Sequence, residues 1–291
     1  MTKRSNSSRL FDYLNLAFLI LFSFVTLYPF WNVLTISLTP YEIAVHSPIV
    51  LFPTEISWEG YKYVFSSDSL LKGLTVSLGV TVGVTIYQFA ITSIAAYALT
   101  KKDLPGRNAV LMFILFTMFF NGGLIPYYLL IKSLGLIDSW LVLILPAAIN
   151  TFNLIVIKTY FQGLPAEIEE SALMDGAGYF RIYLQIILPV SLPIVATICL
   201  FISVAAWNEW FNAMLFLNSR EKWPLSLILR DIIVQSNTDI GNQASVHNKT
   251  ALLSETIKMS VIMISILPIM LVYPFIQKYF VKGVMIGAVK S

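Results

Sequence analysis

Six long apolar runs constrain this chain more than any other feature of its sequence. A helix needs about 20 mostly apolar residues to cross the hydrocarbon core of a bilayer. The runs cover residues 14–38, 73–99, 109–131, 139–160, 188–217 and 256–280. Only 12% of the 291 residues are charged, about half the share usual in soluble domains, and 57% are hydrophobic. We therefore predict an all-α integral membrane protein with six transmembrane helices, and we exclude a soluble enzyme and a nucleic-acid binder.

The distribution of basic residues predicts the orientation of these spans. Eleven Lys and Arg residues fall on the side of the N-terminus and eight on the opposite side, where the loops are longer. Because short cytoplasmic loops carry an excess of basic residues, both termini are predicted to be cytoplasmic. The expected parts are the tails 1–13 and 281–291, the membrane domain 14–280, the outer loops 39–72 and 218–255, and a cytoplasmic loop 161–188.

The sequence offers no group that could energise transport. No Lys followed by Ser or Thr has the preceding glycine that a phosphate-binding loop requires. One cysteine and two distant histidines give no metal-binding pattern. We therefore expect no catalytic residue, no metal and no cofactor in this chain, and an energy source in a separate subunit.

A few polar residues lie in or beside the apolar runs. The candidates for lining a substrate path are Asn121, Asn150, Asn153, Asn208 and Glu209. Neutral polar residues of this kind also bridge neighbouring helices in membrane proteins. Glu209 is the sole carboxylate inside a run and is placed near the outer interface. An ion-coupled secondary transporter, which usually keeps carboxylates or histidines near the midplane, is therefore the less favoured alternative.

Glycine and proline residues predict bends or breaks in the spans. Gly122 and Gly123 are expected to bend the third span, and prolines are expected to act in the same way on this and other spans. These prolines are Pro126, Pro146, Pro268 and Pro274.

The cytoplasmic loop 161–188 contains more local order than a simple turn. Pro165 suits the start of a helix, and Glu167, Glu169 and Glu170 complement the positive end of its dipole. We predict one short helix over 165–175, a reversal at Gly176 and Gly178, and a second short helix over 179–187. Large apolar residues left exposed here would favour a protein partner. They are Leu173, Met174 and Phe180.

The same loop carries a spaced motif. Glu170, Ser171 and Ala172 are followed after three residues by Gly176, and after nine more by Ile186, Leu188 and Pro189. This pattern resembles the EAA signature of ABC-importer permeases, in which two alanines follow the glutamate. Six of its seven fixed positions agree, and Ser171 is the departure.

The resemblance extends over most of the chain and is to the MalG-type permease family of carbohydrate ABC importers. Similar segments lie at 53–58, 102–107 and 207–210. Segments 120–128 and 279–287 resemble the branch that carries oligosaccharides derived from polysaccharides. The same coupling signature also occurs in ABC importers of other solutes, so a non-sugar importer remains the second alternative.

The resemblance implies a type I importer fold of the MetI-like and MalG-like kind, with a cytoplasmic coupling helix. It implies a second, homologous permease subunit (MalF- or LplB-like), two copies of a cytoplasmic ABC ATPase that bind ATP and Mg, an extracytoplasmic solute-binding protein, and a bacterial cell membrane. Glu170 is expected to pair with a basic ATPase residue, and Ala172, Leu173 and Gly176 to sit in an ATPase groove. The full set expected to couple to the ATPase is Glu170, Ser171, Ala172, Leu173, Met174, Asp175, Gly176, Ile186, Leu188 and Pro189.

Overall fold

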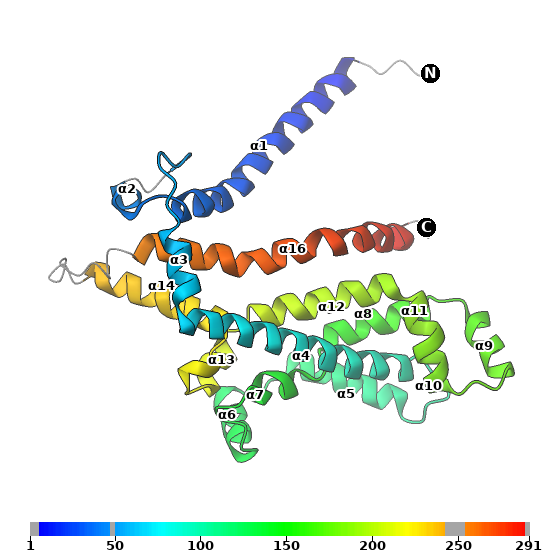
Figure 1. The fold of residues 1–291 in the computed structure, drawn as a ribbon. Helices are drawn as coiled ribbons and strands as arrows, with labels where there is room; N and C mark the ends of the chain where they lie inside the picture. Colours follow the sequence, from blue (N-terminus) through cyan, green and yellow to red (C-terminus); the bar gives the residue numbers. More distant parts are fainter. Residues whose placement is uncertain (1–5, 47–49, 242–253, 289–291) are drawn as a thin grey trace. The chain divides into compact units, whose positions relative to one another are not determined.

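The computed structural model describes residues 6–46, 50–241 and 254–288, which fold into helices joined by turns (Figure 1). The chain divides into two compact units, one formed by residues 1–68 and 231–267 and the other by 69–230 and 268–291. No strand occurs among the described residues. The all-α fold class is therefore confirmed for the described residues.

The first unit contains α1 (Asn6–Ser37), α2 (Tyr41–His46), α3 (Glu59–Ser66) and the parts of α14 (Leu225–Gly241) and α16 (Ser254–Ala288) that fall within it. Small hydroxyl residues join α1 to α16: Thr256 donates to the Thr39 carbonyl and Ser260 to the Ser37 carbonyl, each at 3.4 Å. Gly60 on α3 lies so close that a Cβ there would come within 2.2 Å of the Ser260 hydroxyl. These close approaches hold the end of α1 between α3 and α16.

Most of α1 has no packing partner within its own unit. None of the residues in its most apolar 18-residue window is buried, although the helix segment Leu10–Ser37 is long and apolar enough to cross a membrane. An apolar helix with this exposure is typical of a surface that faces lipid or another membrane subunit.

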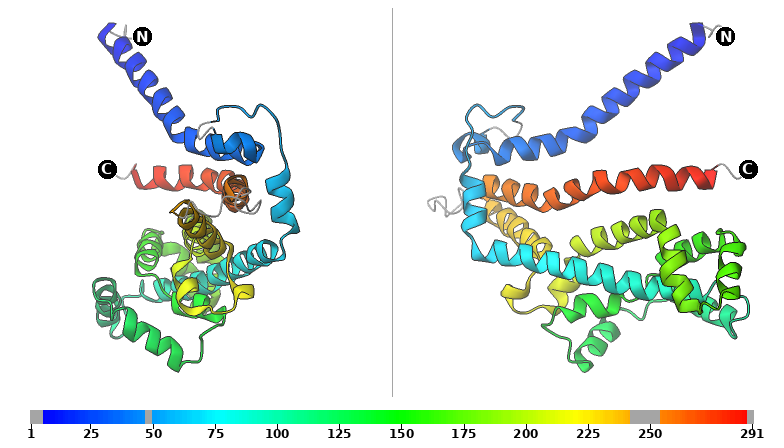
Figure 2. Two further views of the ribbon diagram at one scale, coloured as in Figure 1. Left: turned by 90° about the vertical axis from the view of Figure 1, so that its left-hand side faces the viewer. Right: turned by 45° about the vertical axis from the view of Figure 1, so that its right-hand side comes forward.

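The second unit contains the remaining elements, which are shown from two further sides in Figure 2. They are α4 (Asp68–Ala98), α5 (Arg107–Phe119), α6 (Leu124–Ser133), α7 (Leu141–Ile144), the 3-10 turns η1 (Leu145–Ala147) and η3 (Arg220–Lys222), α8 (Thr151–Gln162), α9 (Ala166–Met174), α10 (Tyr179–Ile182), the π-helix η2 (Tyr183–Ile187), α11 (Leu188–Val190), α12 (Leu192–Trp207) and α13 (Phe211–Phe216). Branched and aromatic side chains from α4, α8, α10, α12 and α13 form its core.

Three helices of the described residues are long and apolar enough to span a membrane, and three further candidates are bent pairs. The long helices are Leu10–Ser37, Asp68–Ala98 and Glu255–Val272. The pairs are Arg107–Phe119 with Leu124–Ser133 at 116°, Leu141–Ala147 with Thr151–Gln162 at 46°, and Tyr179–Val190 with Leu192–Trp207 at 87°. Counting each bent pair as one span gives the six that the sequence predicts.

The bends correct several predicted boundaries. In the run 109–131 the bend expected at Gly122 and Gly123 is confirmed, and it divides the run into two helices, because the chain leaves α5 at Phe120 and restarts α6 after Gly123, whose φ is +87°. The run 188–217 is divided at Ser191 and again after Trp207. By contrast, neither Pro268 nor Pro274 breaks its span, since α16 continues through both.

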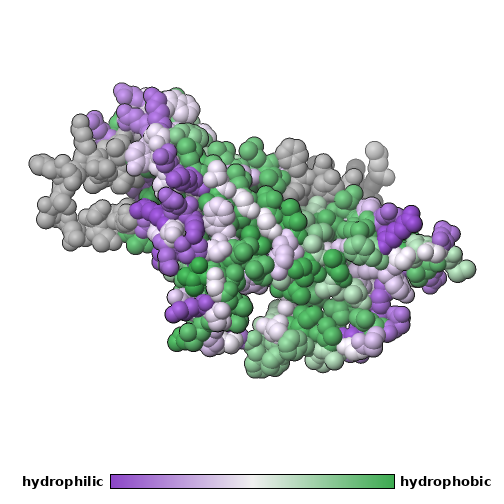
Figure 3. All heavy atoms as spheres, turned by 60° about the horizontal axis from the view of Figure 1, so that its bottom comes forward, coloured by the Kyte–Doolittle hydropathy of each residue, from purple (hydrophilic) through white to green (hydrophobic). Residues whose placement is uncertain are grey.

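The two predicted outer loops also contain helices. α2 and α3 lie within 39–72, and α14 occupies much of 218–255, of which residues 242–253 lie outside the described part of the chain. Hydrophobic residues cover much of the surface that Figure 3 draws. A membrane protein exposes such residues because lipid, rather than water, surrounds its spans.

Candidate functional site: a coupling end and a cavity

The first helix predicted in the loop 161–188 is present as α9, Ala166–Met174. Pro165 is the N-cap rather than the first helical residue, with φ −57° and ψ 130°. Glu167 and Glu169 lie in the first turn, where carboxylates stabilise the positive end of the helix dipole. The predicted range 165–175 is therefore confirmed to within one residue at each end.

Gly176 ends this helix with a Schellman motif. Its φ is +78°, its amide donates to the Leu173 carbonyl at 3.0 Å, and the Ala177 amide donates to the Ala172 carbonyl at 3.0 Å. Left-handed backbone at this position favours glycine. The reversal predicted from Gly176 is thus confirmed, whereas Gly178 is extended, with φ −75° and ψ 155°.

The inward side of α9 is fastened to the end of α4 by Glu169. The Glu169 carboxylate accepts a hydrogen bond from the Tyr97 hydroxyl at 3.1 Å and forms an ion pair with Lys101. The Lys101 ammonium also lies 4.0 Å from the centre of the Tyr97 ring and 5.4 Å from that of Tyr179. The side chains of Lys101 and Glu169 are only 17% and 23% exposed, so water screens this pair less than a surface salt bridge. We call Tyr97, Lys101 and Glu169 the inner clasp.

Aromatic packing supports the inner clasp. The Tyr97 ring lies 5.4 Å from the Tyr183 ring and 6.3 Å from the Phe161 ring, measured between centroids. The Tyr183 hydroxyl is hydrogen-bonded to the Ser93 hydroxyl at 2.7 Å. α4, α8, α9 and the π-helix therefore meet at one end of this unit, where Figures 1 and 2 draw α9 beside α10.

The outward side of the same loop is apolar and exposed. Met174 is 89% exposed, and Phe180 and Leu173 are 64% and 39% exposed. Glu170 and Ser171 are exposed as well, and the Ser171 hydroxyl donates to the Glu167 carbonyl one turn earlier. The departure of Ser171 from the motif is thus accommodated within α9. This combination of exposed apolar residues and the exposed Glu170 carboxylate is typical of a protein-docking surface.

Other residues of the motif take different positions. Ala172 is buried in the core of its own unit, so its side chain does not lie on the exposed face, where the expected contact with an ATPase groove would place it. Ile186 and Leu188 are half-buried and pack against the same core, whereas Pro189 and Asp175 are exposed. The motif therefore specifies how the loop is anchored as well as what it presents.

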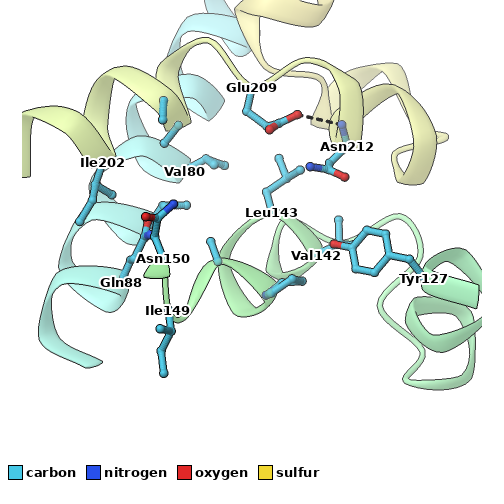
Figure 4. A pocket seen from close by; sticks show the side chains of 15 residues that line it. Val80, Gln88, Tyr127, Val142, Leu143, Ile149, Asn150, Ile202, Glu209 and Asn212 are labelled. Atoms are coloured by element: carbon cyan, nitrogen blue, oxygen red, sulfur yellow. Dashed lines mark hydrogen bonds between the residues drawn. The ribbon is translucent and has the colours of Figure 1, made fainter. Parts of the chain in front are cut away.

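A cavity of about 270 Å³ lies farther along the same unit, between α4, α7, α12 and the turns after them (Figure 4). Its walls include Val80, Val84, Val142, Leu143 and Ile202, and its polar lining consists of Gln88, Tyr127, Asn150, Glu209 and Asn212. Glu209 accepts a hydrogen bond from the Asn212 amide at 2.9 Å. The cavity therefore brings together polar groups from residues 88–212.

Two of the five predicted path residues, Asn150 and Glu209, line this cavity. Asn150 also caps α8 by accepting from the Asn153 amide at 3.0 Å. The other three do not line it. Asn153 is buried in α8, Asn121 accepts from the Gly123 amide at the α5–α6 break, and the Asn208 amide donates to the Val204 carbonyl. Asn121 and Asn208 are exposed and satisfy backbone groups at helix ends.

Sequence reasoning missed Gln88, Asn212 and the inner clasp. Gln88 is an isolated amide in the apolar run 73–99, and an uncharged polar residue within a span is a signal that could have found it. Glu169 belongs to a row of three glutamates, and no local feature distinguishes it from Glu167 or Glu170. Its partners, Tyr97 and Lys101, are 72 and 68 residues away in the sequence.

A second carboxylate fastens the opposite part of the unit. Asp138, at φ +57°, accepts hydrogen bonds from the Asn218 and Ser219 amides at 3.0 and 2.9 Å, from the Ser219 hydroxyl at 2.7 Å, and from Lys222 at 2.8 Å. These contacts, that of Lys222 foremost, hold the pKa of the Asp138 carboxyl well below its usual range. We call Asp138, Ser219 and Lys222 the outer clasp.

Comparisons with known proteins identify the family. Residues 106–286 match the model of the family described as binding-protein-dependent transport system inner membrane component. This chain belongs to that family, and it is thus a component of a membrane transport system. The matched residues include α9, the reversal at Gly176 and Gly178, and most of the cavity lining.

Individual relatives match over nearly their full length. The chain is 44% identical to the polygalacturonan/rhamnogalacturonan transport system permease protein YtcP of Bacillus subtilis, over 98% of this chain and 99% of that protein. It is 43% identical to protein LplC of the same organism, over 99% and 97%. It also superposes with a TM-score of 0.87 and 32% identity on a chain of a bacterial ABC transporter involved in alginate import, covering 96% and 100%. The predicted resemblance to permeases of sugar importers is therefore confirmed.

Proposed function

We propose that this chain is the transmembrane permease subunit of an ATP-driven importer of sugars, and that its cargo is an oligosaccharide derived from a polysaccharide. The observation that carries the proposal is the two-sided loop 161–188. Its inward side is fastened to the transmembrane unit through Glu169, and its outward side exposes Met174, Phe180 and Glu170. A loop that is anchored on one side and apolar on the other can receive a force from a partner and deliver it to the spans.

The names of the relatives support the class of cargo. YtcP belongs to a polygalacturonan and rhamnogalacturonan transport system, and AraQ of Bacillus subtilis, 27% identical, belongs to an arabinooligosaccharide system. The solved structure with 32% identity belongs to an importer of alginate. All three cargoes are built from sugar rings, which favours an oligosaccharide over a non-sugar solute.

The proposed assembly contains four kinds of chain. This subunit forms half of the translocation path, and a homologous permease forms the other half. Two cytoplasmic ATPases bind ATP and Mg, and an extracytoplasmic solute-binding protein delivers the cargo. A solved structure of the alginate transporter contains a pentasaccharide-bound periplasmic protein, which illustrates such delivery. The excess of basic residues on the side of the N-terminus favours cytoplasmic termini.

The inner clasp gives the coupling a mechanical route. Tyr97, one of the residues that bind Glu169, lies near the end of α4, and the same helix contributes Val80, Val84 and Gln88 to the cavity. Because an α-helix rises 1.5 Å per residue, Gln88 lies about 14 Å along α4 from Tyr97. A displacement of α9 by the ATPase would therefore move one wall of the cavity, since packed helices shift as rigid elements.

The residues proposed to contact the ATPase are the exposed members of the motif and their neighbours. Glu170 is proposed to pair with a basic residue, while Leu173, Met174 and Phe180 fill a groove. Ser171, Asp175 and Gly176 shape the same surface, and Ala172, Ile186, Leu188 and Pro189 set its position on the bundle. Asn150 and Glu209 are proposed to face the cargo.

Replacement of Glu170 by lysine tests the proposal. We expect Glu170→Lys to insert in the membrane normally, because the side chain is exposed and outside the apolar spans, and to lose co-purification with the ATPases. Asp103→Lys is the matched control, since Asp103 is also an exposed carboxylate and lies in the α4–α5 turn, outside the motif. ATPase binding at the unmodified level in Glu170→Lys, with sugar uptake intact, would refute the proposed coupling.

A further inference from the structure

The side chain of Gln88 is the starting point, because it is a buried polar group without a partner. Gln88 is 8% exposed and lies in α4, within a predicted span. Its side-chain amide forms no hydrogen bond with another described residue. Its polar atoms are not fully enclosed either, unlike the unpaired polar atoms of Asn32, Thr81 and Ser191. The amide opens into the cavity instead. In a membrane interior such a group needs a partner, because neither lipid nor backbone can satisfy it.

Three more polar groups face the same cavity with free hydrogen-bonding capacity. One oxygen of Glu209 accepts from the Asn212 backbone amide, and the other has no partner among the described residues. The Asn150 side-chain oxygen is used to cap α8, which leaves its NH₂ group to donate. The side-chain amide of Asn212 makes no hydrogen bond within the described chain, and Figure 4 shows both Glu209 and Asn212 on the cavity wall.

The chemistry of these groups indicates the class of ligand. Amides donate and accept, and a carboxylate accepts, so together they match the hydroxyl groups of a sugar ring. The lining contains a carboxylate and no Lys, Arg or His, which disfavours a ring that carries its own carboxylate. Val80, Val84 and Leu143 present apolar surface, which suits the C–H faces of a ring.

The size of the cavity limits how much of the cargo it holds. Its volume of about 270 Å³ is slightly below the range of roughly 300–1,000 Å³ that is usual for pockets enclosing drug-sized ligands. One ring fits in such a space and an oligosaccharide does not.

We infer that Gln88, Asn150, Asn212 and Glu209 form a binding site for one uncharged sugar ring, so that this subunit contacts the cargo directly. The inference rests on the proposed function, because it supplies the contact between this permease and the sugar. It adds that neutral rings of a mixed oligosaccharide bind here in preference to uronate rings, and that Gln88 is the central contact.

The test uses the assembled transporter in detergent, without its solute-binding protein. Saturation-transfer NMR is recorded with methyl α-L-rhamnoside as the neutral probe and methyl α-D-galacturonoside as the acidic probe. We expect the neutral glycoside to bind at least about tenfold more tightly, and Gln88→Leu to weaken its binding by about tenfold, since lost hydrogen bonds to a desolvated site have effects of that order. Thr85→Val, which removes a hydroxyl from the same helix outside the cavity lining, is the matched control and should bind like the unmodified protein.

Glu209→Gln keeps the size and one acceptor of the side chain and removes its charge. It should weaken binding of the neutral glycoside, because an amide replaces the free carboxylate oxygen, and bring the two probes to within about threefold of each other, because the repulsion is gone. Equal binding of both probes to the unmodified transporter, or tight binding of the neutral probe by an assembled Gln88→Leu complex, would overturn the inference. Failure of the proposed function shows separately, as absence of ATP-dependent sugar uptake by the complete unmodified transporter.

Discussion

The inner and outer clasps each fasten a turn of the chain through one carboxylate, but their partners differ in kind. Glu169 is held by two side chains, the Tyr97 hydroxyl and the Lys101 ammonium. Asp138 is held by two backbone amides in addition to Ser219 and Lys222. The outer clasp thus joins two loops largely through backbone amides, whereas the inner clasp joins α9 to the end of α4 through side chains alone. The inner clasp is therefore suited to transmit movement and the outer clasp to prevent it.

The largest effect is expected when the inner clasp is turned into a repulsion. Glu169→Lys places two ammonium groups together at a site where the native pair is mostly buried, and breaking a buried pair costs about 3–5 kcal/mol. We expect ATP-dependent uptake to fall to a few per cent while the subunit still inserts. The double variant Glu169→Lys with Lys101→Glu restores opposite charges and should recover a large part of the uptake per ATP hydrolysed.

A purely structural role for Glu169 would leave the uptake per ATP hydrolysed unchanged in every variant that still assembles. Glu167→Lys is the matched control, because Glu167 lies in the same first turn of α9 but its side chain is exposed. Its uptake should stay close to that of the unmodified protein.

The next effect concerns the reversal beside the inner clasp. Gly176→Val forces a branched residue to φ +78°, which costs at least about 1 kcal/mol. Nothing in the described chain lies within 4 Å of the Cβ position, so the cost inside this subunit is backbone strain alone. We expect several-fold weaker association with the ATPases, measured by co-purification.

Gly178→Val provides the comparison for this variant. Gly178 also has open space around its Cβ position, and its φ of −75° is accessible to any residue. Equal losses in the two variants would show that the backbone conformation of Gly176 is not what matters.

A smaller effect is expected at the outer clasp. Asp138→Ala removes the acceptor of the Asn218 and Ser219 amides, and hydrogen exchange at these two amides should become faster by about tenfold, as is typical when a local hydrogen bond is lost. Uptake should fall less than in Glu169→Lys, because the outer clasp joins two loops and makes no contact with α9. A loss of uptake equal to that of Glu169→Lys would remove the distinction between the clasps.

The exposed pair of Lys72 and Glu221 should matter least among the substitutions. Their charged atoms are 3.8 Å apart, and the side chains are 57% and 81% exposed. Surface pairs of this kind contribute about 0–1 kcal/mol. Glu221→Gln should leave the thermal midpoint of the purified subunit within about 2 °C of the unmodified value.

The outer clasp should also be insensitive to moderate acid. The pKa of Asp138 is lowered in the folded chain, so its contribution to stability is fully present above the ordinary Asp pKa of about 3.9 and is lost only as the pH falls toward the lower folded value. Protection of the Asn218 and Ser219 amides, corrected for intrinsic exchange, should therefore be equal at pH 7 and pH 5. A marked loss of protection at pH 5 would contradict the lowered pKa.

Residues that start or end helices locally explain which parts of the structure the sequence could predict. The helix α9 and its end at Gly176 follow from a proline, three glutamates and a glycine within 12 residues, and these signals act on neighbouring backbone. The break at Phe120–Gly123 follows from two adjacent glycines. Pro268 and Pro274 do not break their span, because a proline removes a single backbone hydrogen bond and a membrane helix can continue through it.

The parts that could not be predicted depend on contacts between distant residues. Glu169 resembles Glu170 in sequence, and only the arrival of α4 beside α9 distinguishes the anchored carboxylate from the exposed one. The cavity likewise takes Gln88 from one helix and Glu209 from a turn more than a hundred residues later. Hydropathy alone does not predict that these two residues line the same cavity.

The π-helix Tyr183–Ile187 has a consequence for the spacing of the motif. Each residue of an α-helix turns the chain by about 100°, and a π-turn admits one residue more than an α-turn. The wide turn therefore takes up one residue of the spacing between Gly176 and Ile186. Deleting one residue within the π-helix would close it into a regular α-turn and leave the helix that follows close to its present phase, so the motif could lose a residue here without turning Leu188 away from the core.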